Sequence, residues 1–176
     1  MVIMDDKYDG YKAFNADFSN CIGEVCTENT IYNYSGDVVE RKSGFHFCKR
    51  LEDVFKYYNG LNKDIIICKI KAMDDIVWYS DEDYFYGDYD DIGVCSKIYI
   101  GNVMTRDEIM AYVDKLRPDA LMRFLRGYRL NEKEIEYIKG RVCDKYKGNF
   151  LEDSILKCIG YYQEGIKDIY SKKLKR

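Results

Sequence analysis

The sequence predicts an α+β protein in which a β-rich part, residues 1–104, is followed by a helical extension, residues 105–176. Short runs of β-branched and aromatic residues recur through the first hundred positions, which is typical of strands. From Thr105 onward the apolar residues recur at helical spacing. Because 47% of the 176 residues are hydrophobic, the chain can fill one core, and we expect the extension to pack on the β-rich part.

The first part is predicted to contain five strands and one helix. The clearest strand is Asp64–Ala72, which begins with β-branched residues and then alternates. In the helix, apolar positions follow the i, i+3, i+4, i+7 pattern from Leu51 to Tyr58, and Asn59-Gly60 follows as its C-terminal cap. The other predicted strands are Tyr11–Phe14, Thr30–Tyr34, Gly44–Cys48 and Cys95–Gly101.

The extension is predicted to contain three or four helices, each with its own start signal. Thr105–Glu108 has the spacing of a capping box, in which a hydroxyl and a carboxylate each accept from a backbone N–H. Pro118 suits a first turn, because the N–H that proline lacks would have no intrahelical partner there. Asn131–Glu134 caps the third helix, and a fourth is expected from Leu151 to about Tyr170.

Scarce residue types exclude several kinds of site. Only one histidine, His46, is present, so a multi-histidine metal site within the chain is excluded and a catalytic triad could use only His46. The seven cysteines lack C-x-x-C spacing and are expected to be mostly small buried residues; a zinc site with Cys21 and Cys26 is the alternative. No apolar run approaches the roughly 18 residues of a membrane span. Residues 1–9 do not resemble a signal peptide, so we expect a soluble, intracellular protein.

Charge divides the chain into an acidic front and a basic rear. Residues 1–114 hold 12 Lys or Arg against 22 Asp or Glu, a net of −10, whereas residues 115–176 hold 16 against 9, a net of +7. Two surfaces with different partners, mutual attraction of the two parts and ordinary solvated surface all fit this pattern. Residues 117–129 and 172–176 concentrate the positive charge, as either a nucleic-acid contact or plain helix surface.

The most unusual segment is residues 81–91, which packs six carboxylates and four aromatic rings into eleven positions. Such a composition is costly to bury, so we expect a surface loop or hairpin. Its carboxylates can imitate the phosphate spacing of nucleic acid, while its aromatic rings supply interface anchors. A solvated loop is the alternative, and the spacing does not fit a calcium loop. The candidate partner-binding residues are Asp81, Glu82, Asp83, Tyr84, Tyr86, Asp88, Tyr89, Asp90 and Asp91.

Three motifs in residues 8–103 resemble an uncharacterised domain family found in phages and bacteria. Members of that family show Y-K-G-F-(N/D), then G-F-H-x-C, then D-V-F-x-Y-Y. In this chain the corresponding runs are Tyr11–Asn15, Gly44–Cys48 and Asp53–Tyr58. The resemblance implies a setting in phage or mobile-element biology, and hence in the cytoplasm of a bacterial host cell. It implies no particular activity.

The same strands also resemble, more weakly, the scaffold of NAD-using ADP-ribosyltransferases. That resemblance implies small split antiparallel sheets around an NAD cleft, with Lys12 at the first-strand polar position and His46 at a position that one branch fills with Tyr. Tyr57 or Tyr58 would stack on the nicotinamide. The late strand, Val94–Ile100, has no Glu where the family needs one to stabilise a cationic transition state. The alternatives are a packed His46, a snorkelling Lys12 and core tyrosines.

These observations lead to three functional hypotheses. The first is a phage or mobile-element accessory protein that binds a protein or nucleoprotein with a basic groove, such as a nucleic-acid-guided host defence complex. It would act as an anti-CRISPR type of inhibitor and would need no cofactor. The second is an ADP-ribosyltransferase with Lys12, His46 and Tyr58 as catalytic residues, Tyr57 and Tyr58 at the cofactor, and NAD as cosubstrate. The third is a nucleic-acid binder that uses the basic helices.

Overall fold

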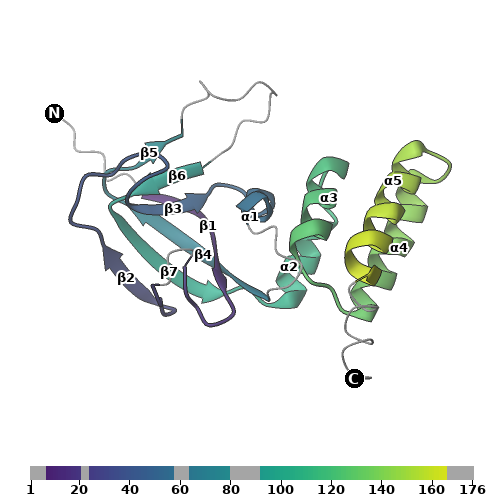
Figure 1. Cartoon of the computed structure of the whole chain (residues 1–176), viewed down its shortest axis with the longest axis horizontal. Helices are drawn as coiled ribbons and strands as arrows, with labels where there is room; N and C mark the ends of the chain where they lie inside the picture. Colours follow the sequence, from purple (N-terminus) through teal and green to yellow (C-terminus); the bar gives the residue numbers. More distant parts are fainter. Residues whose placement is uncertain (1–6, 21–23, 58–63, 80–91, 166–176) are drawn as a thin grey trace. The chain divides into compact units, whose positions relative to one another are not determined.

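The computed structural model describes residues 7–20, 24–57, 64–79 and 92–165, which form two compact units (Figure 1). The first unit draws on residues up to 57 and on residues 65–105. The second contains Asp64 and the residues from 106 onward.

The first unit is built on one antiparallel sheet, so the predicted α+β class is confirmed. Its strand order is β2-β7-β4-β1-β3-β6-β5. All the recorded strand pairs are antiparallel, and the longest runs between β1 and β4, from Lys7 opposite Met73 to Asn15 opposite Ile65. The strands are β1 (Lys7–Asn15), β2 (Thr30–Asn33), β3 (Phe45–Cys48), β4 (Ile65–Met73), β5 (Val77–Trp78), β6 (Ile92–Cys95) and β7 (Lys97–Val103).

The split pair of small sheets implied by the second resemblance is not what the structure has, since all seven strands belong to one sheet. Within this sheet the register between β1 and β3 is recorded at one pair, Tyr11 with Cys48. Two short strands, β5 and β6, were not predicted. Their Val77–Trp78 and Ile92–Cys95 runs are too short to show a period and border the acidic segment.

The apolar core of this unit lies on both faces of the sheet. One face carries a cluster that includes Phe14, Phe47, Cys68, Ile98 and Ile100, from strands distributed across the sheet. Alternate β4 residues bury their side chains there, which explains the strand's period of two. Helix α1 (Leu51–Tyr57) packs on β1 and β3 through its buried Leu51, Val54 and Phe55. Burial of side chains of this size contributes roughly 1.5–3 kcal/mol each.

The second unit is helical, as the apolar spacing predicts. It contains α2 (Arg106–Val113), α3 (Pro118–Gly127), α4 (Glu132–Tyr146) and α5 (Phe150–Ile159), followed by a π-helical turn, Gly160–Glu164. Pro118 occupies the first turn of α3. Asn131 caps α4 through a complete capping box with Glu134, as predicted. The fourth helix was predicted as one α-helix to about residue 170, but its α-helical part ends at Ile159, and residues beyond 165 lie outside the described range.

Candidate functional site

The connection that carries the acidic aromatic segment starts and ends at the edge of the sheet. β5 pairs with β6 through Val77 opposite Val94 and Trp78 opposite Gly93. The Tyr79 N–H then donates to the Ile92 carbonyl oxygen at 3.0 Å, which closes the base of the connection. All nine predicted partner-binding residues, Asp81, Glu82, Asp83, Tyr84, Tyr86, Asp88, Tyr89, Asp90 and Asp91, lie outside the described residues.

An aromatic cluster fixes the strand that leads into this connection. The Trp78 ring packs edge-to-face on Tyr8 at a centroid distance of 4.9 Å and on Phe47 at 5.4 Å. Gly93 allows this packing, because a Cβ there would lie 2.5 Å from the Phe47 ring. Trp78 remains 40% exposed, and the Lys49 ammonium lies 5.8 Å from its ring centroid in cation–π geometry. The result is a fixed, partly exposed tryptophan two residues before the undescribed segment.

His46 lies on β3, close to the same edge, with its ring edge-to-face on Tyr79 at 5.9 Å. Its Nε2 atom is buried and has no hydrogen-bond partner among the described residues. Burial lowers the pKa of His46, and the nearby Lys12 ammonium lowers that pKa further. The ring is therefore neutral at pH 7, and its orphan nitrogen is the feature that keeps His46 a candidate for ligand contact.

Lys12 and His46 meet through the backbone and not through their side chains. The Lys12 ammonium donates to the main-chain carbonyl of His46 at 2.6 Å. Because Tyr11 is opposite Cys48, those two side chains leave the same face of the sheet, and His46 shares that face with Cys48. Lys12, which follows Tyr11, leaves the other face. The Lys12 amine thus links β1 to β3 next to their recorded register pair.

The structure describes too little of the remaining residues of the predicted enzyme site to place their side chains. Tyr57 is the last residue of α1, and Tyr58 lies outside the described residues. The predicted zinc ligand Cys26 is buried, while Cys21 lies outside the described range. Within the described residues no three potential metal ligands come together. The catalytic and cofactor assignments therefore remain predictions.

The described cysteines fit the prediction of small buried residues, with one partly exposed. Cys26, Cys48, Cys68, Cys95 and Cys158 are buried, whereas Cys143 is intermediate. Burial raises the pKa of the Cys68 thiol to about 12 and that of the Cys95 thiol to about 11. Both are protonated at neutral pH, which makes them poor nucleophiles.

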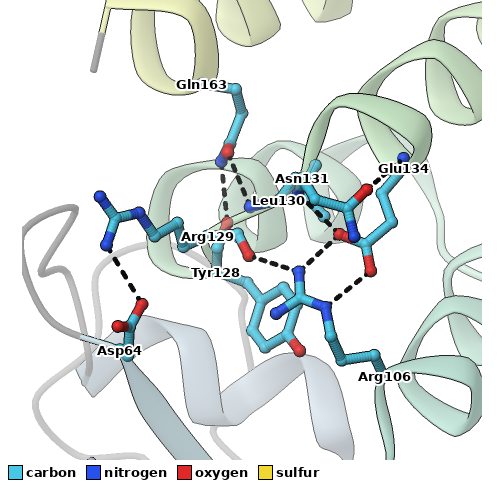
Figure 2. Close-up of polar contacts among 8 residues, drawn as sticks. All are labelled: Asp64, Arg106, Tyr128, Arg129, Leu130, Asn131, Glu134 and Gln163. Atoms are coloured by element: carbon cyan, nitrogen blue, oxygen red, sulfur yellow. Dashed lines mark hydrogen bonds and ion pairs between the residues drawn. The ribbon is translucent and has the colours of Figure 1, made fainter. Parts of the chain in front are cut away.

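The predicted basic contact over residues 117–129 consists of arginines that already have partners within the second unit. Arg117 and Arg123 approach the Asp119 carboxylate at 3.7 and 3.3 Å. Arg126 lies over the Tyr162 ring, and Arg129 pairs with Asp64 at 3.3 Å (Figure 2). Phosphates would have to compete with these partners. The second predicted stretch, residues 172–176, lies outside the described residues.

A buried polar network that sequence reasoning missed links the π-helical turn to the end of α3 and to the connection that follows α3 (Figure 2). Gln163 is 4% exposed; its Nε2 donates to the Leu125 and Tyr128 carbonyls at 2.5 and 2.8 Å, and its Oε1 accepts from the Leu130 N–H at 3.1 Å. A lone Gln in a polar-looking stretch gives no signal of this role. Only the π-helical turn places its amide against the end of α3.

Beside it, an ion pair secures the start of α4. Arg106 donates to both Glu134 carboxylate oxygens and to the Arg129 carbonyl, and the Asn131 N–H donates to Glu134 at 2.8 Å. Burial alone raises the pKa of Glu134, but the hydrogen bonds from Arg106 and Asn131 outweigh it and hold that pKa below its ordinary value. The capping box was predicted, whereas the arginine partner was not.

No helix among the described residues is long and apolar enough to cross a membrane.

Comparison with known proteins places the first unit in a family. No curated protein and no solved structure matches the chain. A family described as a domain of unknown function, DUF7666, matches residues 8–110, which include all of the sheet except Lys7, while no ADP-ribosyltransferase family matches. The motif resemblance to an uncharacterised family is thereby confirmed, and the chain belongs to the DUF7666 family.

Proposed function

We propose that this protein acts by binding, with the acidic aromatic segment of residues 81–91 as its contact surface. The partner would be a protein or nucleoprotein with a basic groove. The observation that carries the proposal is the closed base of this segment, where the Tyr79 N–H donates to the Ile92 carbonyl at 3.0 Å. Antiparallel pairing of β5 with β6 holds the described residues on either side of the segment, Tyr79 and Ile92, at one place on the sheet, and a site whose ends are held in advance loses less entropy on binding.

The chemistry of the segment favours a partner that normally holds phosphates. Closely spaced carboxylates meet the same lysines and arginines that bind a nucleic-acid backbone. Trp78, three residues before the segment in the chain, presents a partly exposed aromatic ring of the kind that interfaces use as an anchor. In the phage or mobile-element setting implied by the motifs, a nucleic-acid-guided host defence complex is a partner of this kind. The protein would then be an inhibitor of that complex inside the bacterial host cell.

The test begins with capture of partners from a bacterial host lysate on the immobilised chain at rising salt. Each captured protein is then purified and its association rate with the chain is measured. Replacing Asp83, Asp88 and Asp90 with Asn should slow association, because charge steers the encounter, and should leave the melting temperature nearly unchanged.

A matched control removes the same charge elsewhere. Asp9, Asp37 and Asp144 are exposed on the described surface, and their replacement with Asn should leave association almost unchanged. Equal association rates for the two triple variants would refute the proposal. If the captured partner is a nucleic acid held by residues 117–129, the third hypothesis replaces the first.

The orphan Nε2 of His46 supports a second candidate function, an NAD-using ADP-ribosyltransferase. A buried ring nitrogen with no partner among the described residues could bond a ligand, and Tyr79 lies beside it. Labelled NAD is incubated with host lysate and the chain. Label transfer that His46→Ala or Lys12→Ala abolishes would establish the enzyme and replace the binding-only proposal. If label transfer with the chain does not exceed the transfer in lysate without the chain, the ADP-ribosyltransferase hypothesis is rejected.

A further inference from the structure

Helix α5 and the π-helical turn after it have two sides of opposite character. Ile155, Cys158 and Ile159 are buried on the side that packs against the other helices of the second unit. The opposite side carries Phe150, the first residue of the helix, and Tyr161, in the π-helical turn. These two residues are 75% and 76% exposed, the highest values among the large hydrophobic residues that the structure describes. A single exposed ring is ordinary, whereas two on one side of a helix form a surface that a partner can cover.

Two opposite charges lie between these rings. Phe150 and Tyr161 are eleven residues apart, about three helical turns, so they lie on the same side of the helix. Asp153 and Lys157 fall between them on that side, and both are exposed. Neither charged group has an ion pair or a hydrogen bond with any residue that the structure describes. We call these four residues the α5 stripe; its order is ring, carboxylate, ammonium, ring.

The α5 stripe is complementary to an antiparallel copy of itself. In a dimer with a two-fold rotation axis, a residue that contacts a second residue of the partner is matched by the reciprocal contact. One such axis serves both kinds of contact here. The midpoint between Phe150 and Tyr161 and the midpoint between Asp153 and Lys157 differ by half a residue, or about 0.8 Å along a helix. Rings and opposite charges therefore meet in the same arrangement.

The two central charges favour a second copy over other occupants. An acidic segment or a nucleic acid would pair with Lys157 but would be repelled by Asp153, and a basic segment would meet the reverse conflict. A second copy satisfies both groups. Two aromatic side chains bury at most about 150–250 Å² each, so the contact is smaller than the roughly 800 Å² per partner of a standard interface. The dimer is expected to be weak.

We propose that the α5 stripe is a contact surface for a second copy of this chain, with the two α5 helices antiparallel. Each Phe150 ring packs on Tyr161 of the other copy. Each Asp153 carboxylate pairs with Lys157 of the other copy. The expected Kd is on the order of 10–100 µM. This surface lies in the second unit and does not depend on the function proposed above.

Sedimentation equilibrium of the full chain from about 5 to about 500 µM, a range that spans this Kd, should show a shift from monomer to dimer. Asp153→Lys and Lys157→Asp each set like charges against one another across the axis, so each variant alone should dimerise at least about tenfold more weakly. An equimolar mixture of these two variants should recover a Kd within about threefold of the parent value, because every central contact of the mixed dimer joins opposite charges.

Further variants separate the stripe from general effects. Phe150→Ala should weaken the dimer at least about tenfold, because an aromatic contact is lost, and should leave the melting temperature of the dilute chain within about 2 °C. Asp37→Lys and Lys42→Asp make the same charge changes at exposed positions of the first unit and should each leave the Kd within about twofold.

Three results would overturn the proposal. The first is a chain that stays monomeric over the whole concentration range. The second is a dimer that Asp153→Lys and Lys157→Asp leave intact, or a mixture of the two that fails to dimerise. The third is a dimer that is lost only when Asp83, Asp88 and Asp90 are replaced with Asn, because the contact then involves the acidic segment and not the α5 stripe.

Discussion

Loss of the Gln163 amide should destabilise the second unit strongly, although the polar residues around Gln163 in the sequence are typical of an exposed surface. The side chain is 4% exposed and makes three hydrogen bonds, two as donor to the Leu125 and Tyr128 carbonyls and one as acceptor from the Leu130 N–H. Gln163→Leu removes all three. At a net value of about 1 kcal/mol for each bond, the expected loss in free energy of unfolding is about 3 kcal/mol.

Two further variants sharpen this prediction. Gln163→Glu keeps an acceptor for Leu130 but loses the donor to the two carbonyls, so at pH 7 it should be at least as destabilised as the Leu variant. Burial beside two carbonyls should raise the pKa of this Glu above its ordinary value of about 4.3, and the protonated Glu can donate again, so part of the loss should be recovered as pH falls through that raised pKa. Tyr161→Ala, at a side chain 76% exposed on the same turn, should change stability by less than about 0.5 kcal/mol.

The assay is urea unfolding followed by far-ultraviolet circular dichroism, with amide hydrogen exchange read at Leu130. A loss of about 3 kcal/mol corresponds to a melting point lower by roughly 12–24 °C for a unit of this size. Hydrogen exchange of the Leu130 amide should accelerate strongly in the Gln163→Leu variant, because the Leu130 N–H loses the Gln163 oxygen as its acceptor. A Gln163→Leu chain that unfolds within about 0.5 kcal/mol of the parent, with unchanged Leu130 exchange, would show that the amide network is not structural.

The other predictions concern close packing and pH. Gly93→Ala should destabilise the first unit by about 1–3 kcal/mol in thermal melts, because its Cβ would lie 2.5 Å from the Phe47 ring; Gly140→Ala, with nothing within 4 Å, should stabilise α4 by about 0.5–1 kcal/mol. The pKa of Glu134 is lower in the folded chain than in the unfolded chain, where it is about 4.3, so its carboxylate stabilises the fold above that pH. This stability is lost as pH falls through the folded pKa. Glu134→Gln should therefore weaken the dependence on acid pH of the free energy of unfolding, measured in urea. The pKa of His46 is lowered in the folded chain, so as pH falls the unfolded chain protonates this histidine first. The free energy of unfolding should therefore decrease as pH drops below about 6.5. An NMR titration of this single histidine that gives a pKa at or above 6.5 would contradict the burial argument.

The local elements of this chain were largely predictable, because local signals specify them. Residues 65–73 form a strand where β-branched residues alternate, and α1 begins at Leu51 where the apolar period changes. The capping box at Asn131–Glu134 and the proline at the start of α3 were also predictable, since both depend on groups within a few residues. The short β5 and β6 were missed, because only their pairing with each other and with β3 makes them strands.

The candidate enzyme site shows where sequence reasoning stops. The motifs brought Lys12 and His46 to notice, and the structure places the Lys12 ammonium 2.6 Å from the His46 carbonyl. Their side chains nevertheless leave opposite faces, because the register Tyr11 opposite Cys48 fixes which face each residue takes. No spacing in the sequence specifies register between strands that lie more than thirty residues apart.

By itself, the sequence determined the α+β class, the helix starts in the extension, the family motifs and the concentration of negative charge in residues 81–91. Those features depend on composition and on contacts within a turn or two of the chain. Only the tertiary structure decided that seven strands form one sheet, that Trp78 stays partly exposed at its edge, and that Gln163 is buried against the end of α3. Each of these depends on residues that are distant along the chain and become neighbours only when the core closes, so no local pattern carries them.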